Sequence, residues 1–175
     1  MQKLSSLFSF SGMILERKTL YLLRGLPASG KSSWIKKHGA EKFTLEPDAI
    51  RLELSPVPVV LPDGTRGIDQ SRNKEVFEIL FRRLSKRLKT GEPVVIDATN
   101  LRRIDILSYE EKAIIAGYEL CVVDFTSVPF SVCFERNAKR LPDWKRVPAA
   151  VMEKMRETLA RESVPDRVRV ISFRE

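Results

Sequence analysis

A glycine-rich stretch at residues 24–32, RGLPASGKS, constrains the fold of this chain more than any other feature, because it fits the pattern G-x-x-x-x-G-K-[ST]. Gly25 and Gly30 permit backbone angles that a residue with a Cβ resists, so successive N–H groups can converge on phosphate oxygens. An apolar run precedes the pattern at 20–23, and a helical stretch follows at 31–38, whose N-terminus adds partial positive charge. The stretch predicts a site for a nucleoside triphosphate; the alternative is a strand-to-helix turn that merely contains glycines.

Each part of this phosphate-binding loop has an expected role. The ammonium group of Lys31 would reach the outer phosphates, and the hydroxyl of Ser32 would ligate Mg²⁺. The other positions expected to contact the nucleotide are Gly25, Ala28, Ser29, Gly30 and Ser33.

The composition is that of an ordinary soluble protein with an excess of positive charge. The 175 residues have the length of one domain, and 43% of them are hydrophobic and 31% charged. The formal net charge of +8 favours a polyanionic partner such as nucleic acid, without requiring one. Cys121 and Cys133 lie among apolar residues, which predicts buried free thiols in a reducing compartment. The single histidine, His38, excludes a histidine-rich metal site and is expected at the C-terminus of the first helix.

The expected domain organisation is an N-terminal extension at 1–18, which could be flexible, followed by one domain at 19–175. Ser and Gly interrupt the apolar residues before residue 16, and no small-residue cleavage site follows, so a signal peptide is not expected. No segment approaches the roughly 18 apolar residues that a membrane span needs. These features predict a cytoplasmic protein that does not contact membranes.

Segments typical of strands alternate with segments typical of helices along the chain. We expect strands at 19–23, 42–45, 94–96, 120–125 and 168–173, and helices at 31–38, 48–54, 70–89, 103–116, 129–140 and 148–161. The stretch 55–67 contains three prolines and an Asp-Gly turn pair, so we expect a loop there, with a small hairpin at 57–61. Another loop is expected at 141–147. The alternation predicts an α/β fold in which a parallel sheet lies between helices.

A carboxylate follows the third expected strand directly, in the sequence Asp97-Ala98-Thr99-Asn100. Open α/β sheets bind ligands beyond the carboxyl ends of their strands, so Asp97 is expected to hold Mg²⁺ beside Ser32. The alternative is that Asp97 only forms a turn with the backbone near Thr99.

Asp48 and Arg51 form a second candidate pair, which follows the second expected strand. Three residues apart at the start of a helix, they lie on one face. The carboxylate could accept a proton from an attacking hydroxyl, and the guanidinium could hold a phosphate of the acceptor. The alternative is that Asp48 serves as the N-cap of its helix, and the two roles are compatible.

A basic cluster near the end of the fifth expected helix suggests a lid. Arg136 and Arg140 are four residues apart, so on a helix they would share a face and could close over a triphosphate. The alternative is a solvated basic face. The same two interpretations, guidance of nucleic acid or contact with solvent only, apply to the basic residues of the 70–89 helix: Arg82, Arg83, Lys86 and Arg87.

Taken in order, these motifs resemble the 5′-kinase domain of phage and bacterial polynucleotide kinases. The residues that carry the resemblance are the loop at 25–32 followed by Trp34, Asp48-x-x-Arg51, Asp97-x-Thr99-Asn100, Arg136-Asn137-x-Lys139-Arg140 and the helix after Val147-Pro148. The resemblance spans about residues 20–165, and only the loop is specific by itself. The stretch 55–67 is longer than expected for this family. This departure could change which polynucleotide ends are admitted; the alternative is a loop that has no part in the choice of acceptor.

The resemblance implies an ATP- and Mg²⁺-dependent enzyme that phosphorylates the 5′-hydroxyl ends of DNA or RNA. It implies that Asp48 is the general base, that Arg51 contacts the nucleic acid phosphate, and that Lys31 acts on the donor phosphates. Arg136 and Arg140 would belong to a helical lid over those phosphates. The alternatives are a kinase of a small-metabolite alcohol on the same fold and an ATP-switched module that binds nucleic acid.

Overall fold

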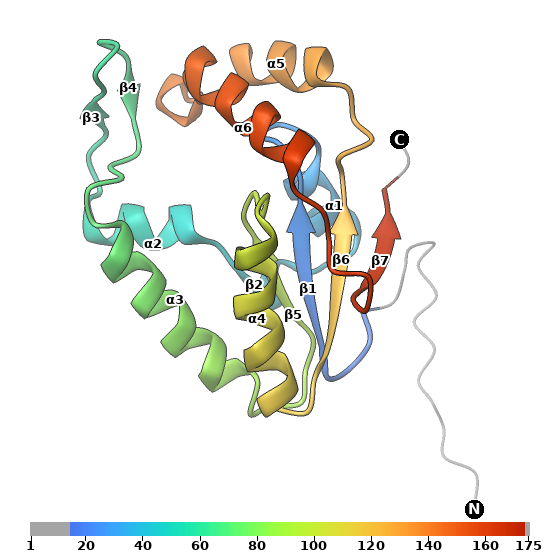
Figure 1. The fold of residues 1–175 in the computed structure, drawn as a ribbon. Coiled ribbons are helices and arrows are strands. Elements are labelled where there is room, and N and C mark those ends of the chain that lie inside the picture. Colours follow the sequence, from blue (N-terminus) through green and yellow to red (C-terminus); the bar gives the residue numbers. More distant parts are fainter. Residues whose placement is uncertain (1–14, 174–175) are drawn as a thin grey trace, which may run out of the picture.

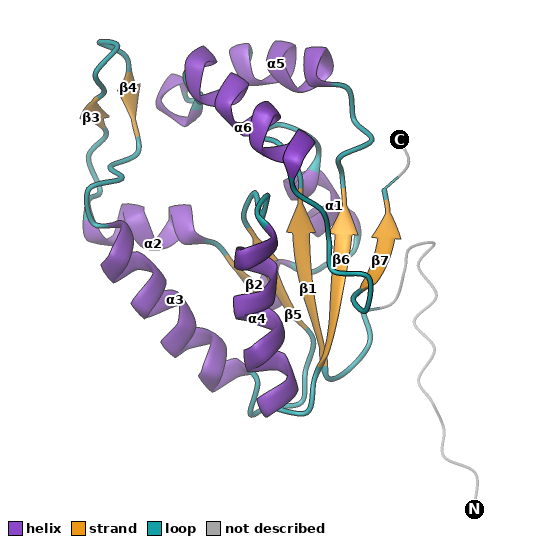
Figure 2. Cartoon of the chain, viewed as in Figure 1, coloured by secondary structure: helices purple, strands orange, loops and turns teal. Residues whose placement is uncertain are grey.

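Five parallel strands form the central sheet in this computed structural model, which describes residues 15–173 (Figures 1 and 2). The order across the sheet is β2-β5-β1-β6-β7, and every pair of neighbours is parallel. The strands are β1 (Thr19–Arg24), β2 (Thr44–Leu45), β5 (Val94–Asp97), β6 (Glu119–Asp124) and β7 (Arg169–Ser172). The predicted α/β fold with a parallel sheet between helices is therefore confirmed, and the central strand β1 is buried along its whole length.

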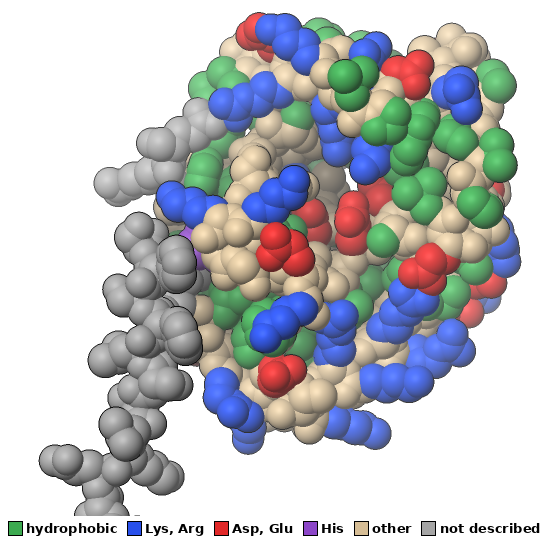
Figure 3. Space-filling model, turned by 180° about the vertical axis from the view of Figure 1, so that it is seen from behind, with side chains coloured by type: hydrophobic (Ala, Val, Ile, Leu, Met, Phe, Trp, Pro, Cys, Tyr) green, Lys and Arg blue, Asp and Glu red, His purple; other side chains and the backbone are tan. Residues whose placement is uncertain are grey.

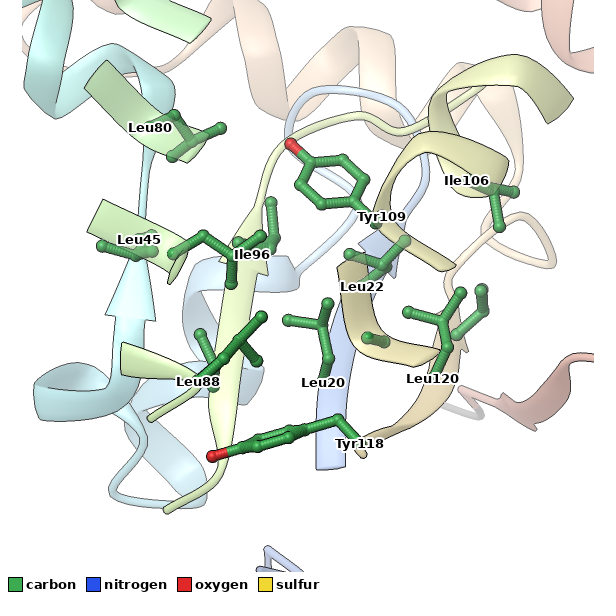
Figure 4. Close-up of a cluster of buried hydrophobic side chains, with 14 of the residues drawn as sticks. Leu20, Leu22, Leu45, Leu80, Leu88, Ile96, Ile106, Tyr109, Tyr118 and Leu120 are labelled. Carbon is green, nitrogen blue, oxygen red and sulfur yellow. The ribbon is translucent and has the colours of Figure 1, made fainter. Parts of the chain in front are cut away.

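Helices cover both faces of this sheet, and the alternation of side chains along β1 divides the core into two parts. Leu20 and Leu22 point to one face, where they pack with α3 (Asn73–Arg87) and α4 (Arg103–Ile115) (Figure 4). Tyr21 and Leu23 belong to the core of the opposite face, which α1 (Lys31–Lys37) covers with Trp34 and Ile35. Burial on both faces explains why β1, β5 and β6 are continuous apolar runs.

Three elements lie at the carboxyl edge of the sheet, beyond the ends of β1 and β5. The helix α2 (Pro47–Leu54) follows β2 through Glu46. The helices α5 (Phe130–Ala138) and α6 (Ala149–Arg161) pack on each other over the same edge, and a short 3₁₀ helix, η2 (Asp143–Lys145), lies between them in the sequence (Figure 1). A second 3₁₀ helix, η1 (Glu41–Phe43), precedes β2.

The insertion between α2 and α3 is a hairpin with wider bounds than predicted. Its strands are β3 (Val59–Val60) and β4 (Arg66–Gly67), so a hairpin is present in this stretch, but the predicted bounds of 57–61 are wrong. The turn lies at Asp63-Gly64, where Gly64 adopts a φ of +79°. Asp63 stabilises that turn because its carboxylate accepts hydrogen bonds from the backbone and the hydroxyl of Thr65.

Cys121 and Cys133 are both buried and form no disulfide with each other, as predicted, and His38 is the C-cap of α1, also as predicted. The predicted extension at 1–18 lies mostly outside the described residues, although Glu16 within it donates its backbone N–H to the hydroxyl of Tyr21. In residues 15–173, no helix has the length and apolar character needed to cross a membrane.

Candidate active site

The phosphate-binding loop links the end of β1 to the start of α1 through unusual backbone angles. Gly25 has a φ of +155°, Ala28 one of +62° and Gly30 one of +103°. A Cβ at position 25 would lie 2.9 Å from the Cβ of Phe125, so only glycine fits there. The loop thus adopts positive φ angles at the two positions for which the sequence pattern supplies glycine.

Lys31 lies inside this loop with its ammonium group held by backbone carbonyls. Its Nζ donates to the oxygens of Gly25 and Leu26, at 2.9 and 2.7 Å. Burial lowers the pKa of Lys31 to about 8, against the opposing effect of the carboxylate of Asp97. A buried cation at the N-terminus of α1 is suited to bind phosphate oxygens.

Ser32 and Asp97 meet at the opening of the loop, as the order of the strands requires. β5 lies next to β1, so the carboxylate that ends β5 faces the first turn of α1, and the hydroxyl of Ser32 donates to Asp97 at 3.3 Å. Burial raises the pKa of Asp97. One hydroxyl and one carboxylate are a fitting set for Mg²⁺, which takes few protein ligands in addition to substrate phosphates, and a dication there would favour the charged form of Asp97.

The residues after Asp97 form hydrogen bonds with the backbone of β1 and of the phosphate-binding loop. The carbonyl of Thr99 accepts the N–H of Gly25 at 3.0 Å, and the buried amide of Asn100 donates to the carbonyl of Leu23 at 2.9 Å. Asn100 has a φ of +44°, a conformation that asparagine tolerates better than most residues. These bonds fix the end of β5 against the end of β1, which positions Asp97 beside Ser32.

Asp48 and Arg51 form an ion pair on α2, with 2.8 Å between the guanidinium and the carboxylate. The helix begins at Pro47 and Glu46 is its N-cap, so the alternative that Asp48 is the N-cap is wrong. The side chain of Asp48 is 49% exposed, whereas that of Arg51 is 10% exposed and also donates to Asn73 of α3. Arg51 therefore orients a carboxylate that a ligand can reach, and its predicted contact with an acceptor phosphate stays a prediction.

Arg140 belongs to the loop between α5 and α6 and not to a helix. Because α5 ends at Ala138 with Lys139 as its C-cap, the prediction that Arg136 and Arg140 share a helical face is wrong. Arg140 nevertheless lies close enough to Lys31 and Asp97 to influence the pKa of both. Arg136 is exposed on α5, and its predicted contact with the nucleotide stays a prediction.

Sequence reasoning missed two charged residues that the fold brings to this place, Glu46 and Lys145. Burial raises the pKa of Glu46, the carboxylates of Asp97 and Asp48 raise it further, and the cations of Lys145 and Arg140 oppose this. Glu46 lies between β2 and α2, and Lys145 lies in η2. Neither belongs to a recognisable motif, so only the tertiary structure reveals them.

A cavity of about 600 Å³ extends from this site beneath α2. Ser32 and Asp97 line one end, and Ala49, Ile50 and Glu53 line it from the underside of α2. Asp48 and Arg51 project from the opposite face of that helix. Residues two positions apart on an α-helix point in nearly opposite directions, and Asp48 is two positions from Ile50 while Arg51 is two positions from Ala49 and Glu53. The cavity is therefore separated by α2 from the Asp48–Arg51 pair.

Basic side chains of α3 form another wall of this cavity, and some of them have structural partners. The two terminal nitrogens of the Arg83 guanidinium donate to the two carboxylate oxygens of Glu53, and Arg87 donates to the carbonyl of Lys42. Lys86 and Arg82 are exposed. Figure 3 shows, on the rear face, basic side chains around a hollow in which acidic and basic groups lie together.

Several solved structures have a similar fold at low sequence identity. A chain of the Pnkp1/Rnl/Hen1 RNA repair complex has a TM-score of 0.65 and 19% identity over 86% of this chain and 46% of its own length. Kti12 from Chaetomium thermophilum, in complex with ADP-AlF3, has a TM-score of 0.59 and 16% identity over 88% and 89%. A chain of the AvrRxo1-ORF1:-ORF2 complex with ATP has a TM-score of 0.54 and 20% identity over 82% and 48%. The protein thus spans about half the length of the Pnkp1 and AvrRxo1 complex chains that it matches.

A family model described as AAA domain matches residues 20–161, which include the phosphate-binding loop, α2 and the loop that carries Arg140. The arrangement of the sheet, loop and helices is that of a P-loop kinase, which implies nucleotide binding and indicates a phosphotransferase. The protein therefore belongs to the AAA domain family and has a P-loop kinase-like fold.

Proposed function

We propose that this protein is an ATP-dependent polynucleotide kinase that transfers a phosphoryl group to the 5′-hydroxyl ends of DNA or RNA. The observation that carries the proposal is the Asp48–Arg51 pair, which presents a half-exposed carboxylate at the same edge of the sheet as the phosphate-binding loop. An NTPase that only switches between states has no evident use for such a pair, whereas a kinase needs a base for its acceptor hydroxyl.

The residues of the site divide between the donor and the acceptor. Lys31 and the loop residues at 25, 28, 29, 30 and 33 would hold the phosphates of ATP, and Ser32 with Asp97 would hold Mg²⁺. Gly25 would contribute through the shape of the turn, because its own N–H donates to the carbonyl of Thr99. The metal would neutralise charge on the phosphate oxygens. Asp48 would take the proton of the acceptor hydroxyl, oriented by Arg51, while Arg140 would stabilise the charge that spreads over the transferred group.

Three further features support a polynucleotide acceptor over a small neutral alcohol. The net charge of +8 favours a polyanion. Arg82 and Lys86 are exposed cations of α3, the helix that packs against α2. The order of motifs resembles polynucleotide kinases, and one structure of similar fold comes from an RNA repair complex.

The decisive experiment follows labelled γ-phosphate from ATP to DNA and RNA oligonucleotides of matched sequence that end in a 5′-hydroxyl. Identical strands with a 5′-phosphate are the controls. We expect label only on the 5′-hydroxyl strands, and the ratio of DNA to RNA labelling would give the preferred acceptor.

Two outcomes would contradict the proposal. If neither strand is labelled while small alcohols are, the protein is a metabolite kinase. If ATP yields only free phosphate in the presence of every acceptor tried, it is an ATP-switched module, and Asp48 has another role.

A further inference from the structure

The hairpin of residues 59–67 has no role in the site described so far, yet it reaches from the acceptor side of the molecule to the loop between α5 and α6. In Figure 1 it stands up from α2 and α3 beside the layer formed by α5 and α6, and its strand β4 packs against η2. We propose that this hairpin is a strut that holds η2, and with it Arg140, in place over the phosphate-binding loop. The inference rests on the proposed phosphotransfer and adds a positioning element to it.

The strut is held together by its own backbone hydrogen bonds and by one side-chain contact. The N–H of Leu61 donates to the carbonyl of Thr65 at 2.8 Å, and the N–H of Gly64 donates to that of Leu61 at 2.9 Å. Gly67 is buried against Leu61 so closely that a Cβ would lie 2.5 Å from Leu61 Cδ1. The hairpin therefore packs on itself through Leu61 and Gly67, and a larger residue at position 67 would require the side chain of Leu61 to move.

The base of the strut is fixed to the two helices that flank it. The hydroxyl of Ser55, just after α2, donates to Asp69 at 3.1 Å, and Asp69 also accepts the N–H of Ser71 at 2.8 Å. The guanidinium of Arg72, just before α3, donates to the carbonyl of Leu54 at 3.1 Å. The hairpin thus stands on the same helix that carries Asp48 and Arg51.

The far end of the strut meets a loop that is itself closed. The buried side chain of Asn137 donates to the carbonyl of Val147 at 2.8 Å and accepts its N–H at 3.0 Å, so both ends of the loop at 138–146 are tied together. Within the loop, Arg146 Nε donates to the carbonyl of Arg140 at 3.0 Å. A displacement of η2 would therefore be transmitted to Arg140.

The function of the strut follows from what this loop carries. Arg140 acts electrostatically on Lys31 and Asp97, and Lys145 of η2 acts on Glu46. The charge of a guanidinium assists phosphoryl transfer only where it is held in place before the reaction. The contact between β4 and η2 connects α2, which carries Asp48, to the loop that carries Arg140. The strut therefore sets the separation between Asp48 and Arg140.

The test combines kinetics with a fluorescence signal that requires no acceptor. Gly67→Val forces Leu61 aside and should loosen the strut, and Leu61→Ala removes the same contact without added bulk. Val60→Ala is the matched control, because Val60 is 74% exposed on the same hairpin. The chain has two tryptophans, so a Trp34→Phe background leaves Trp144 of η2 as a single reporter.

We expect Gly67→Val and Leu61→Ala to increase quenching of Trp144 by acrylamide and to lower kcat by about 10- to 100-fold, with the KM for ATP changed less than about twofold. Val60→Ala should alter neither. In an Arg140→Ala background, Gly67→Val should cause no further loss of kcat, because the group that it displaces is already absent.

Unchanged Trp144 quenching in both strut variants would overturn the inference. The inference would also be overturned if the variant that combines Arg140→Ala with Gly67→Val lost kcat by the full product of the two single losses. The absence of any labelled oligonucleotide would count against the proposed function alone. The quenching comparison would then still decide whether the hairpin holds η2.

Discussion

The two sides of the candidate site are built in different ways. On the donor side, Lys31 and Ser32 follow β1 through one short loop, and the pairing of β1 with β5 brings Asp97 next to them. On the acceptor side, α2 carries the Asp48–Arg51 ion pair, and the hairpin that follows α2 contacts η2, which comes from a distant part of the chain. The donor side is thus fixed by backbone geometry, whereas the acceptor side depends on contacts that a few substitutions can change.

The largest expected effect tests whether the acceptor side carries the chemistry. Asp48→Asn should lower phosphoryl transfer by about 10²–10⁴-fold, because it removes the proton acceptor, while ATP affinity stays nearly unchanged. Initial rates and equilibrium titration with ATP would measure this. Asp105→Asn is the matched control, since Asp105 is likewise a carboxylate in the first turn of a helix that pairs with an arginine three residues away, here Arg102, the N-cap of α4. Full activity of Asp48→Asn would refute its role as general base.

The next effect tests the rigidity of the donor side. Gly25→Ala places a Cβ against Phe125 and should lower the free energy of unfolding by about 1–3 kcal/mol, in addition to weakening ATP binding. Gly39→Ala is the control, because it also requires a positive φ but its Cβ would meet no atom within 4 Å. Urea unfolding of the two variants would separate the steric clash from the cost of the backbone angle. Equal losses would mean that the loop yields to the added methyl group.

The third prediction concerns the charge of Lys31, whose pKa burial lowers to about 8. Only the protonated amine attracts phosphate, so above pH 8 ATP binding must take up a proton, and the Kd should rise by up to about tenfold per pH unit. Calorimetry in two buffers of different ionisation enthalpy would show proton uptake at pH 9 and little at pH 6.5. Lys31→Arg should remove this pH dependence, since arginine stays charged. A flat profile in the unaltered protein would exclude Lys31 as the titrating group.

The smallest effect concerns the basic helix of the acceptor side. Arg83 and Glu53 form an exposed pair, with side chains 40% and 51% accessible, so Arg83→Ala should change the free energy of unfolding by less than about 1 kcal/mol. If α3 contacts the acceptor strand, Arg82→Ala should reduce the salt dependence of oligonucleotide affinity by about one unit of slope. Fluorescence anisotropy at several salt concentrations would measure this. An identical slope would show that Arg82 contacts only solvent.

Much of the fold could be predicted from local patterns. The apolar runs of β1, β5 and β6 and the four-residue spacing of Val76, Leu80 and Leu84 in α3 correspond to buried positions in the structure. The ends of elements were less predictable, because α5 stops two residues before Arg140 and α2 begins at Pro47. Both shifts changed the interpretation of a charged residue, Arg140 in one case and Asp48 in the other.

The sequence alone determined the phosphate-binding loop, because the loop depends on the conformation of consecutive residues that include two glycines, a lysine and a serine. It also determined that Asp97 ends a buried strand, from which its meeting with Ser32 follows once β5 lies beside β1. Only the tertiary structure decided that Glu46 and Lys145 join the site and that the hairpin packs against η2. These contacts join residues far apart in the chain and leave no periodic pattern, so their physical basis, charge and packing between separate elements, exists only in the folded molecule.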